Sequence, residues 1–246
     1  MIAPLRVLTY NIQFGRGTDF VVDLDRIAAA IAPFSPDVLA LQEVDIDRRR
    51  SGARDQVQYL ADKLGLTFEY ATCIDDGAGR CGNATLTRMP ILRTRQLRLP
   101  RRTPTSEPRC ALVTRLAWAG TEVDIVNTHL TDAAGMAERQ TQVEELLSLL
   151  GDERTVLMGD LNCTPWSRPF RTLARRLRPV ASPRSWPAPL PLVPLDHILI
   201  RGDLRVVRSG LWRGPLIRRA SDHAPVFAEL SDASPAGCRG AGSLRW

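Results

Sequence analysis

Short apolar runs recur along the whole length of this 246-residue chain, and they limit most strongly how it can fold. Each run is aliphatic or β-branched and is bounded by turn residues, as expected of buried strands. Segments with helical spacing separate the runs, and no linker or internal repeat interrupts the order. The pattern predicts one α/β domain over residues 1–230, with strands at Leu5–Tyr10, Val38–Leu41, Ala111–Leu116, Val123–Val126, Thr155–Met158, His197–Ile200 and Val226–Leu230.

The segments between the strands include several helix candidates with apolar residues on one face. The predicted helices are Val21–Ala32, Ser51–Leu64, Ala133–Leu150 and Ser167–Leu177. The second and third end at a glycine, which readily adopts the conformation that terminates a helix. A proline-rich stretch over 179–194 predicts a surface loop, and the small, polar residues 231–246 predict a mobile C-terminal tail.

Arginine supplies almost all of the positive charge, because Lys63 is the only lysine and the formal net charge is +6. Guanidinium groups match phosphate geometry, so a phosphate-bearing partner, including a nucleic acid, fits this composition. The codon bias of a GC-rich genome explains the arginines equally well. Six of them fall within Arg93–Arg109. This segment is either a hairpin that contacts polyanions or a solvated loop, and we favour the loop because charge runs are usually solvent-exposed.

The termini and the cysteines bear on where such a chain works. No apolar run approaches the roughly 18–20 residues of a membrane span, and the first ten residues resemble a strand rather than a signal peptide. The five cysteines are odd in number and lack C-x-x-C spacing, so free thiols in a reducing cytoplasm are the simplest account. Cys73 and Cys81 could pair, although nothing requires it. We therefore expect a cytoplasmic monomer without integral membrane contact.

Polar residues suited to catalysis gather at the ends of the predicted strands, where α/β proteins usually build their sites. All three histidines lie in such segments: His129 in Asn-Thr-His-Leu, His197 in Leu-Asp-His-Ile and His223 in Ser-Asp-His-Ala-Pro-Val. Histidine is the side chain that exchanges protons near neutrality. Carboxylates and amides accompany them, namely Asn11, Glu43, Asp160, Asn162, Asp196 and Asp222. These hard oxygen ligands suit Mg²⁺ or Mn²⁺ better than zinc.

Each motif alone has a structural explanation. Asn11 could be a turn residue, Glu43 could begin a surface loop, and Gly-Asp-Leu-Asn around Asp160 could be an Asx-turn. Single motif matches carry a high false-positive risk, so the interpretation depends on the whole set.

Taken in order, the motifs resemble those of the endonuclease/exonuclease/phosphatase superfamily, which includes DNase I, apurinic/apyrimidinic endonucleases, inositol polyphosphate 5-phosphatases and neutral sphingomyelinases. The resemblance covers about residues 5–230. The matching segments are Tyr-Asn-Ile (10–12), Leu-Gln-Glu-Val (41–44), Gly-Asn-Ala-Thr-Leu-Thr-Arg-Met-Pro-Ile (82–91), Asn-Thr-His-Leu (127–130), Gly-Asp-Leu-Asn (159–162), Leu-Asp-His-Ile (195–198) and Ser-Asp-His-Ala-Pro-Val (221–226). The resemblance implies a four-layer α/β sandwich, in which two mixed sheets pack face to face between helices. It also implies phosphoester hydrolysis by water with a divalent metal.

The resemblance also assigns a metal site. Glu43 would be the main ligand of Mg²⁺ or Mn²⁺, with Asn11 beside it and Asp222 completing the site. Asp160 would orient or deprotonate the attacking water, and Asn162 would hold that water or a phosphate oxygen.

The remaining assignments concern the phosphate. His223 would contact the scissile phosphate, and Asp196 would orient and charge its imidazole. His129 would hold a phosphate oxygen or protonate the leaving group. These roles agree with the chemistry, because a metal and an imidazolium stabilise the charge that develops on the phosphate oxygens, and a neighbouring carboxylate raises the pKa of an imidazole.

Other polar residues receive weaker assignments. His197 points to the strand face opposite Asp196, so we expect a structural role. Arg88 and Arg109 are candidate phosphate contacts, and Arg139 and Gln142 are candidate braces of the loop that carries His129. All four could equally be scaffold residues.

Departures from the superfamily's patterns narrow the activity. Val-Pro-Leu-Asp-His around Asp196 differs from the Pro-Ala-Trp-x-Asp-Arg pattern of inositol 5-phosphatases, and the chain is similar to bacterial members of undefined substrate. We expect a phosphodiesterase or nuclease. The alternatives are a phosphomonoesterase, a sphingomyelinase-like lipid phosphodiesterase and, because some relatives of such enzymes lose activity, a non-catalytic binding protein on the same fold.

Overall fold

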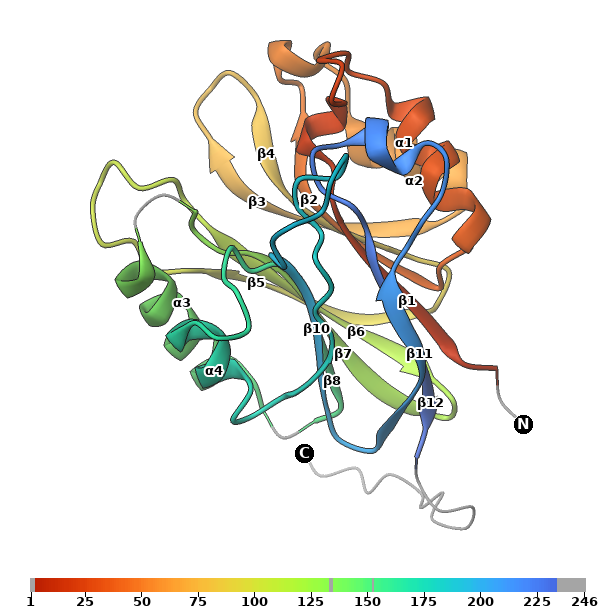
Figure 1. The fold of residues 1–246 in the computed structure, drawn as a ribbon, viewed down its shortest axis with the longest axis vertical. Coiled ribbons are helices and arrows are strands. Elements are labelled where there is room, and N and C mark those ends of the chain that lie inside the picture. The colour runs from red at the N-terminus through yellow and green to blue at the C-terminus, as the bar shows by residue number, and fades with distance from the viewer. Residues whose placement is uncertain (1–2, 133–134, 152, 234–246) are drawn as a thin grey trace.

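Two mixed sheets of six strands pack face to face, with helices on both outer faces (Figure 1). The computed structural model describes residues 3–132, 135–151 and 153–233. The first sheet has the order β11-β12-β1-β2-β4-β3, and the second has the order β5-β6-β7-β8-β10-β9. This is the α/β sandwich that the resemblance implies.

The bounds of the elements follow. The first sheet contains β1 (Leu5–Asn11), β2 (Val38–Ile46), β3 (Thr67–Asp75), β4 (Arg80–Thr87), β11 (Leu204–Leu211) and β12 (Val226–Asp232). The second contains β5 (Ile91–Arg98), β6 (Cys110–Trp118), β7 (Thr121–His129), β8 (Thr155–Asp160), β9 (Arg178–Ala181) and β10 (Asp196–Arg201). The helices are α1 (Leu24–Ile31), α2 (Gln56–Leu64), α3 (Met136–Leu149), α4 (Arg168–Leu173) and α5 (Ile217–Ala220), and three 3₁₀ turns cover Gln13–Gly15, Ala32–Phe34 and Arg49–Ser51.

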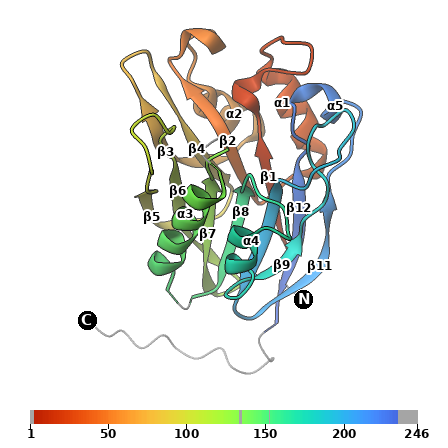
Figure 2. The same cartoon turned by 60° about the vertical axis from the view of Figure 1, so that its left-hand side comes forward.

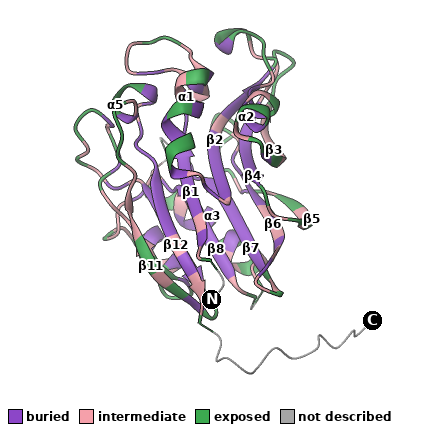
Figure 3. Cartoon of the chain, turned by 90° about the vertical axis from the view of Figure 1, so that its right-hand side faces the viewer, coloured by how far each residue is buried: buried purple, intermediate pink, exposed green. Residues whose placement is uncertain are grey.

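Three apolar layers follow from the alternation of side chains along the strands. Helices α1, α2 and α5 pack on the outer face of the first sheet, and α3 and α4 pack on the outer face of the second (Figure 2). Between the sheets, alternate residues such as Val7, Val38, Ile125 and Met158 form the inner layer. The central strands are buried along most of their length (Figure 3).

The predicted strands all lie within observed ones, but five strands were not predicted. β3, β4 and β11 carry mixed polar residues, and β9 lies partly in the stretch expected to be a loop. β5 carries three of the six arginines of Arg93–Arg109, so the first part of that segment is an edge strand rather than a solvated loop. β3, β5, β9 and β11 lie at the edges of the sheets, where strands bury few side chains and lack the apolar signature of central strands. β4 is a buried inner strand, but its sequence Arg-Cys-Gly-Asn-Ala-Thr-Leu-Thr contains few large apolar residues.

Helices α1 and α2 begin later than predicted because their capping residues lie further along the chain, and α4 ends at Leu173 rather than at the predicted Leu177. Asp23 accepts a hydrogen bond from the backbone nitrogen of Arg26, and Asp55 accepts one from that of Gln58, so α1 and α2 begin after these residues. The third predicted helix begins at Met136 after Gly135, and its first expected residues, 133–134, lie outside the described residues. β12 continues to Asp232, past the expected domain boundary at 230, and residues 234–246 of the predicted tail lie outside the described residues.

A disulfide joins Cys73 of β3 to Cys110 of β6 and so links the two sheets. The expectation that all cysteines are free thiols is therefore wrong, and so is the alternative pairing of Cys73 with Cys81. Cys81 and Cys163 are free and buried. The argument for a cytoplasmic location used free thiols and loses that support, because disulfides persist mainly in oxidising surroundings. In the described part of the chain, no helix has the length and hydropathy needed to cross a membrane.

Candidate active site

Six strands bring polar side chains to one end of the layer between the sheets. Inward-facing residues of β1, β7, β8 and β10 are apolar in the middle of this layer and polar at one end, where Asn11, His129, Asp160 and Asp196 lie. β1 runs parallel to β2, and β7 runs parallel to β8, so their carboxyl ends meet at the same edge. β10 is antiparallel to β8 and begins there, with Asp196 opposite Asp160. The predicted catalytic residues therefore share one end of the molecule.

Asp160 lies at the centre of this group and is almost completely buried. Its Oδ2 accepts a hydrogen bond from the amide nitrogen of Asn11 at 3.1 Å, and its Oδ1 accepts one from the backbone nitrogen of Asn162 at 3.0 Å. His129 Nε2 and His223 Nε2 lie 3.4 Å and 3.6 Å from Oδ2. Burial raises the pKa of Asp160 above its ordinary value, although the His223 charge acts in the opposite direction.

His223 lies between two carboxylates. Its Nδ1 is 2.8 Å from Asp196 Oδ2, and its Nε2 faces Asp160. Burial alone would lower the pKa of His223, but the charges of Asp196 and Asp160 outweigh it and raise the pKa above its usual range. The ring is therefore an imidazolium near neutral pH, and both of its nitrogens donate.

His129 has the opposite charge state. Burial and the Arg109 guanidinium lower the pKa of His129 well below its ordinary value, so the ring is neutral. Arg109 Nη1 lies 3.0 Å from His129 Nδ1. Because a guanidinium only donates, Nδ1 accepts and the ring proton is on Nε2, facing Asp160. Asn162 Nδ2, which lies 3.0 Å from that Nε2, donates to the Leu130 carbonyl oxygen at 3.0 Å. The site thus contains one charged and one neutral imidazole.

Glu43 reaches the site through an irregularity in β2. The register between β2 and β4 shifts between Leu41 and Val44, and Glu43 has a φ of 54°. A β-bulge of this kind redirects a side chain. The carboxylate accepts a hydrogen bond from Asn11 Nδ2 at 2.8 Å, so the Asn11 amide holds Glu43 and Asp160 together. Burial raises the pKa of Glu43, as expected of a carboxylate without an ion-paired arginine or lysine among the described residues.

Asp222 lies at the edge of the group and is half-buried. Ser221 Oγ donates to Asn11 O at 2.8 Å and lies 3.3 Å from Asp222 Oδ1 and from the His223 backbone nitrogen. The segment 221–223 is therefore tied to the end of β1. Burial is the main cause of the raised pKa of Glu43, and the negative charge of Asp222 adds to it.

The chemistry of these donors fits a divalent cation. Asp160, Asp196 and His223 present ligand atoms that lie within 4.8 Å of one another, and this buried cluster could hold a metal ion. The protonated His223 ring lies between those two carboxylates and would repel a cation there, whereas Glu43 forms no ion pair within 4 Å among the described residues. Glu43, with Asn11 and Asp222, is therefore the better candidate site for a hard cation such as Mg²⁺.

A buried polar layer supports the site from below. Gln42 Nε2 donates to Asn127 Oδ1 at 2.8 Å across the two sheets and to Thr9 Oγ1 at 3.0 Å. Asn127 donates to the carbonyl oxygens of Leu41 and Ala84. Ser185 Oγ accepts from the Asp196 backbone nitrogen at 3.2 Å and fixes the start of β10. No role was predicted for these residues, although Gln42 and Asn127 directly follow predicted strands and occupy inward-facing positions of the observed β2 and β7.

The two predicted arginine contacts separate in space. Arg109 is buried beside His129. Arg88 lies past the end of β4, where Thr87 pairs with Val38 at the start of β2, and it contacts Ser35 and Asp37. This is the end of the sheet opposite the site. The assignment of Arg88 as a substrate contact is therefore wrong, because the direction of β4 carries it away.

Arg139 and Gln142 brace the loop after His129, as predicted. Arg139 Nη1 donates to the carbonyl oxygens of Thr131 and Asp132, and Gln142 Oε1 accepts from the Thr131 backbone nitrogen. Both side chains project from α3, so this helix fixes the segment that leaves β7.

His197 lies on the outer face of β10, as the alternation predicted. It is completely buried, its Nε2 is 2.7 Å from the Cys163 carbonyl oxygen, and its ring centroid is 4.7 Å from that of Phe170. His197 thus packs β10 against α4 and does not face the site.

This burial makes stability depend on pH. Burial lowers the pKa of His197 to about 4. A group whose pKa is lower in the folded state stabilises the fold above its unfolded pKa of about 6.5, and that contribution is lost as the pH falls towards the folded value. We expect protonation of His197 to lower the free energy of unfolding by about 3 kcal/mol as the pH falls from 6.5 to 4. Urea unfolding of the wild type and of His197→Gln at several pH values tests this. Parallel pH profiles for the two proteins would contradict it.

Comparison with known proteins agrees with this geometry. The family model of the endonuclease/exonuclease/phosphatase family matches residues 8–223, a range that contains the candidate site residues from Asn11 to His223. The chain belongs to this family. Members of the endonuclease/exonuclease/phosphatase family hydrolyse phosphoester bonds and typically depend on a divalent metal.

Individual relatives share the fold over most of the chain. The uncharacterized protein YbhP of Escherichia coli K12 is 26% identical over 253 residues, covering 92% of this chain and 95% of YbhP. An endonuclease/exonuclease/phosphatase structure from Beutenbergia cavernae superposes with a TM-score of 0.79 at 24% identity, covering 94% of this chain and 72% of that one. The human Nocturnin catalytic domain with a bound sulfate anion gives 0.73 at 22% identity and 94% coverage of both chains. These similarities establish the fold and leave the substrate open.

Proposed function

We propose that this protein is a phosphodiesterase that depends on Mg²⁺ or Mn²⁺ and uses water as the nucleophile. The proposal rests mainly on the contacts that surround the Asp160 carboxylate. Asn11 and Asn162 fix its two oxygens, and a neutral and a charged imidazole lie within 3.6 Å of it. A carboxylate that is fixed beside a charged and a neutral donor supplies the base and the anion-binding groups that phosphoester hydrolysis needs.

The proposed metal site consists of Glu43, Asn11 and Asp222. A divalent cation held there would neutralise the phosphate charge that otherwise repels the nucleophile. The donors are oxygens, and one of them is a largely buried carboxylate with no ion-paired partner in the described structure. The preference for Mg²⁺ or Mn²⁺ over zinc follows from the absence of cysteine or neutral histidine in this set.

The residues divide the chemistry between them. Asp160 accepts a proton from the attacking water, and Asn162 helps to hold that water or a phosphate oxygen. The His223 imidazolium donates to a phosphate oxygen, and Asp196 fixes its orientation through Nδ1. His129 donates from Nε2 to a phosphate oxygen or to the leaving group, while Arg109 fixes its tautomer from Nδ1.

A phosphomonoesterase, a lipid phosphodiesterase of the sphingomyelinase kind and a non-catalytic binding protein are the alternatives. Hydrolysis of bis(4-nitrophenyl) phosphate with Mg²⁺ and with Mn²⁺ tests the proposal directly, and 4-nitrophenyl phosphate and sphingomyelin serve as comparison substrates. A higher rate on a monoester than on any diester would favour the phosphatase. The absence of both turnover and metal binding at millimolar concentration would favour the binding protein.

Metal binding itself gives a separate prediction. Glu43→Gln keeps the size of the side chain and removes its charge, so we expect the affinity for Mg²⁺ and Mn²⁺ to fall by at least about tenfold. Titration calorimetry of the wild type and the variant measures this. Glu122→Gln is the matched control, because Glu122 is exposed near the start of β7 and pairs with Arg115. Equal affinities for the wild type and Glu43→Gln would place the metal elsewhere, and the Asp160, Asp196 and His223 cluster would be the next candidate.

A further inference from the structure

A groove of about 760 Å³ runs between β3 of the first sheet and β5 and β6 of the second, beside the proposed active site. Four arginines line it: Arg80, Arg98, Arg101 and Arg109. The proposed mechanism uses only Arg109. The other three extend the positive surface away from the residues that would act on the scissile phosphate.

The charge of the groove is only partly neutralised by its own residues. Arg80 and Arg98 take part in no ion pair among residues 3–132, 135–151 and 153–233. Arg101 contacts the carbonyl oxygen of Ser106. Of the two aspartates that line the groove, Asp76 is already paired with Arg48. Guanidinium groups that have no carboxylate partner and line a concave surface are suited to bind phosphate.

The arginine-rich segment 93–109 divides between two faces. Gln96 donates to the Thr72 carbonyl oxygen of β3, so its side of β5 faces the groove, and Arg98 lies on the same side. Arg93 and Arg95 lie on the other side of β5, in a small cleft with Arg115. The first part of this segment is thus an edge strand with one side lining the groove and the other lining a cleft at the end of α3, and its contact with polyanions stays a prediction.

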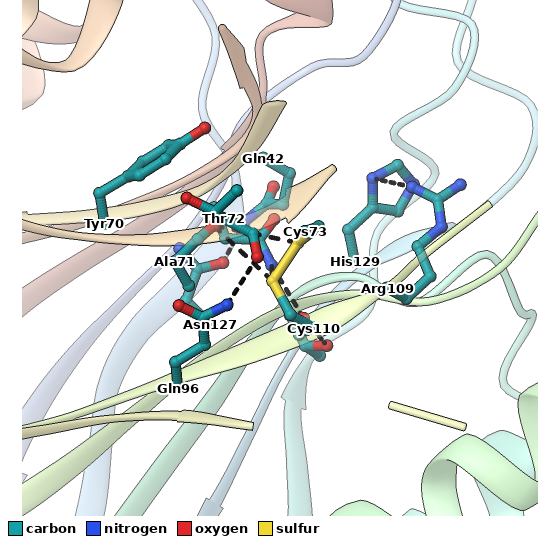
Figure 4. Close-up of a disulfide and its surroundings, with 12 residues drawn as sticks. Gln42, Tyr70, Ala71, Thr72, Cys73, Gln96, Arg109, Cys110, Asn127 and His129 are labelled. Carbon is teal, nitrogen blue, oxygen red and sulfur yellow. Dashed lines mark hydrogen bonds between the residues drawn. A yellow bond between two sulfur atoms is a disulfide. The ribbon is translucent and has the colours of Figure 1, made fainter. Parts of the chain in front are cut away.

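The groove adjoins the site. Arg109 and Cys73 line both the groove and a smaller pocket that contains Glu43 and His129. The disulfide between Cys73 and Cys110 lies at this junction, and Arg109 beside it points towards His129 (Figure 4). A ligand in the site and a group bound in the groove would therefore have Arg109 and Cys73 as a common wall.

We infer that the groove binds a second phosphate group of the substrate, next to the phosphodiester that is cleaved. The inference rests on the proposed function, because it takes the scissile phosphate to lie beside His129 and His223. Arg98 and Arg101 would contact the second phosphate, with Arg80 on the opposite wall. The substrate is thus a phosphodiester that carries a further phosphate, such as an oligonucleotide or a phosphodiester of a polyol that bears a second phosphate.

Binding of matched ligands tests this. Thymidine 3′,5′-bisphosphate is compared with thymidine 5′-monophosphate and 3′-monophosphate by titration calorimetry, in the presence of Mg²⁺. Inositol 1,4-bisphosphate and inositol 1-phosphate form the second arm. The protein carries Asp160→Asn throughout, so that no ligand is hydrolysed during the titration. A preference of about tenfold for a bisphosphate is expected, since charge-assisted hydrogen bonds of this kind contribute on that order. A preference among the thymidine phosphates would indicate a nucleotide ligand, and a preference among the inositol phosphates would indicate a polyol phosphate.

Two double variants decide whether the groove is responsible. Arg98→Ala with Arg101→Ala should abolish the preference, whereas Arg93→Ala with Arg95→Ala should retain it, because those residues lie on the other side of β5. Equal affinity for bisphosphates and monophosphates in both arms would overturn the inference, as would a preference that survives the first double variant. Hydrolysis of bis(4-nitrophenyl) phosphate by the protein without Asp160→Asn is measured in parallel. Its failure would refute the proposed function, and turnover without a bisphosphate preference would refute only the groove.

Discussion

Asp160→Asn is expected to lower kcat/KM for bis(4-nitrophenyl) phosphate by about 10³-fold, within the range that loss of a general base produces. The substitution keeps the shape of the side chain and one acceptor oxygen, so the hydrogen bond from either Asn11 or Asn162 is retained while the new amide nitrogen faces the other donor. It removes the charge that would accept the proton of the attacking water. We expect kcat to fall more than KM rises, because the proton transfer belongs to the transition state.

A matched control separates this effect from a general disturbance of the fold. Asp124 also lies in a central strand and is hydrogen-bonded, but its partner is Arg115 and it sits near the start of β7, away from the site. Asp124→Asn should retain activity even if it lowers the melting temperature. Steady-state kinetics and thermal unfolding of both variants give the two readouts. A wild-type kcat in Asp160→Asn would remove this residue from the mechanism.

His223→Ala is expected to lower kcat/KM by a similar factor of about 10³, because the lost imidazolium would otherwise stabilise the charge on the phosphate. Its effect on stability differs from that of Asp160→Asn. Without the ring, the carboxylates of Asp160 and Asp196 face each other with no cation between them. Breaking a buried pair by removing one partner costs about 3–5 kcal/mol, so the melting temperature should fall as well.

A second variant guards against simple unfolding. His223→Gln fills the space and can still donate one hydrogen bond, but it carries no charge. It should be more stable than His223→Ala and nearly as inactive. His197→Gln is the control, since His197 is equally buried and lies on the other face of β10. The assignment fails if His223→Gln remains active, or if His197→Gln loses activity while it stays folded.

The candidate site could be predicted because its residues occupy inward-facing ends of apolar strands. Asn11, Asp160 and Asp196 each continue a run of buried residues on the inner face of their strand, so alternation and order along the chain were sufficient to group them. Glu43 follows a different rule, since a bulge and not the alternation turns it towards the site. Its motif identified it, but the regular pattern of β2 would have placed it on the outer face.

Other features depend on neighbours that are distant in sequence. Nothing local in the segment that contains Arg88 reveals that β4 runs antiparallel to β2 and carries it to the wrong end. Cys73 and Cys110 meet only because the edge of one sheet folds over the other. Similarly, the arginines of β5 acquire their two environments from β3 on one side and from the neighbourhood of α3 on the other. Such relations arise from tertiary packing and leave no periodic trace along the chain.

The disulfide also has a practical consequence for biochemistry. It is the described structure's covalent tie between the sheets, and Arg109, which holds the neutral histidine, directly precedes Cys110 in the sequence. Preparations kept in thiol-containing buffer and preparations kept without it are therefore two chemical species, which differ in a wall shared by site and groove. Rates and affinities gathered from one should not be averaged with those from the other, and the oxidation state belongs among the recorded conditions of every assay.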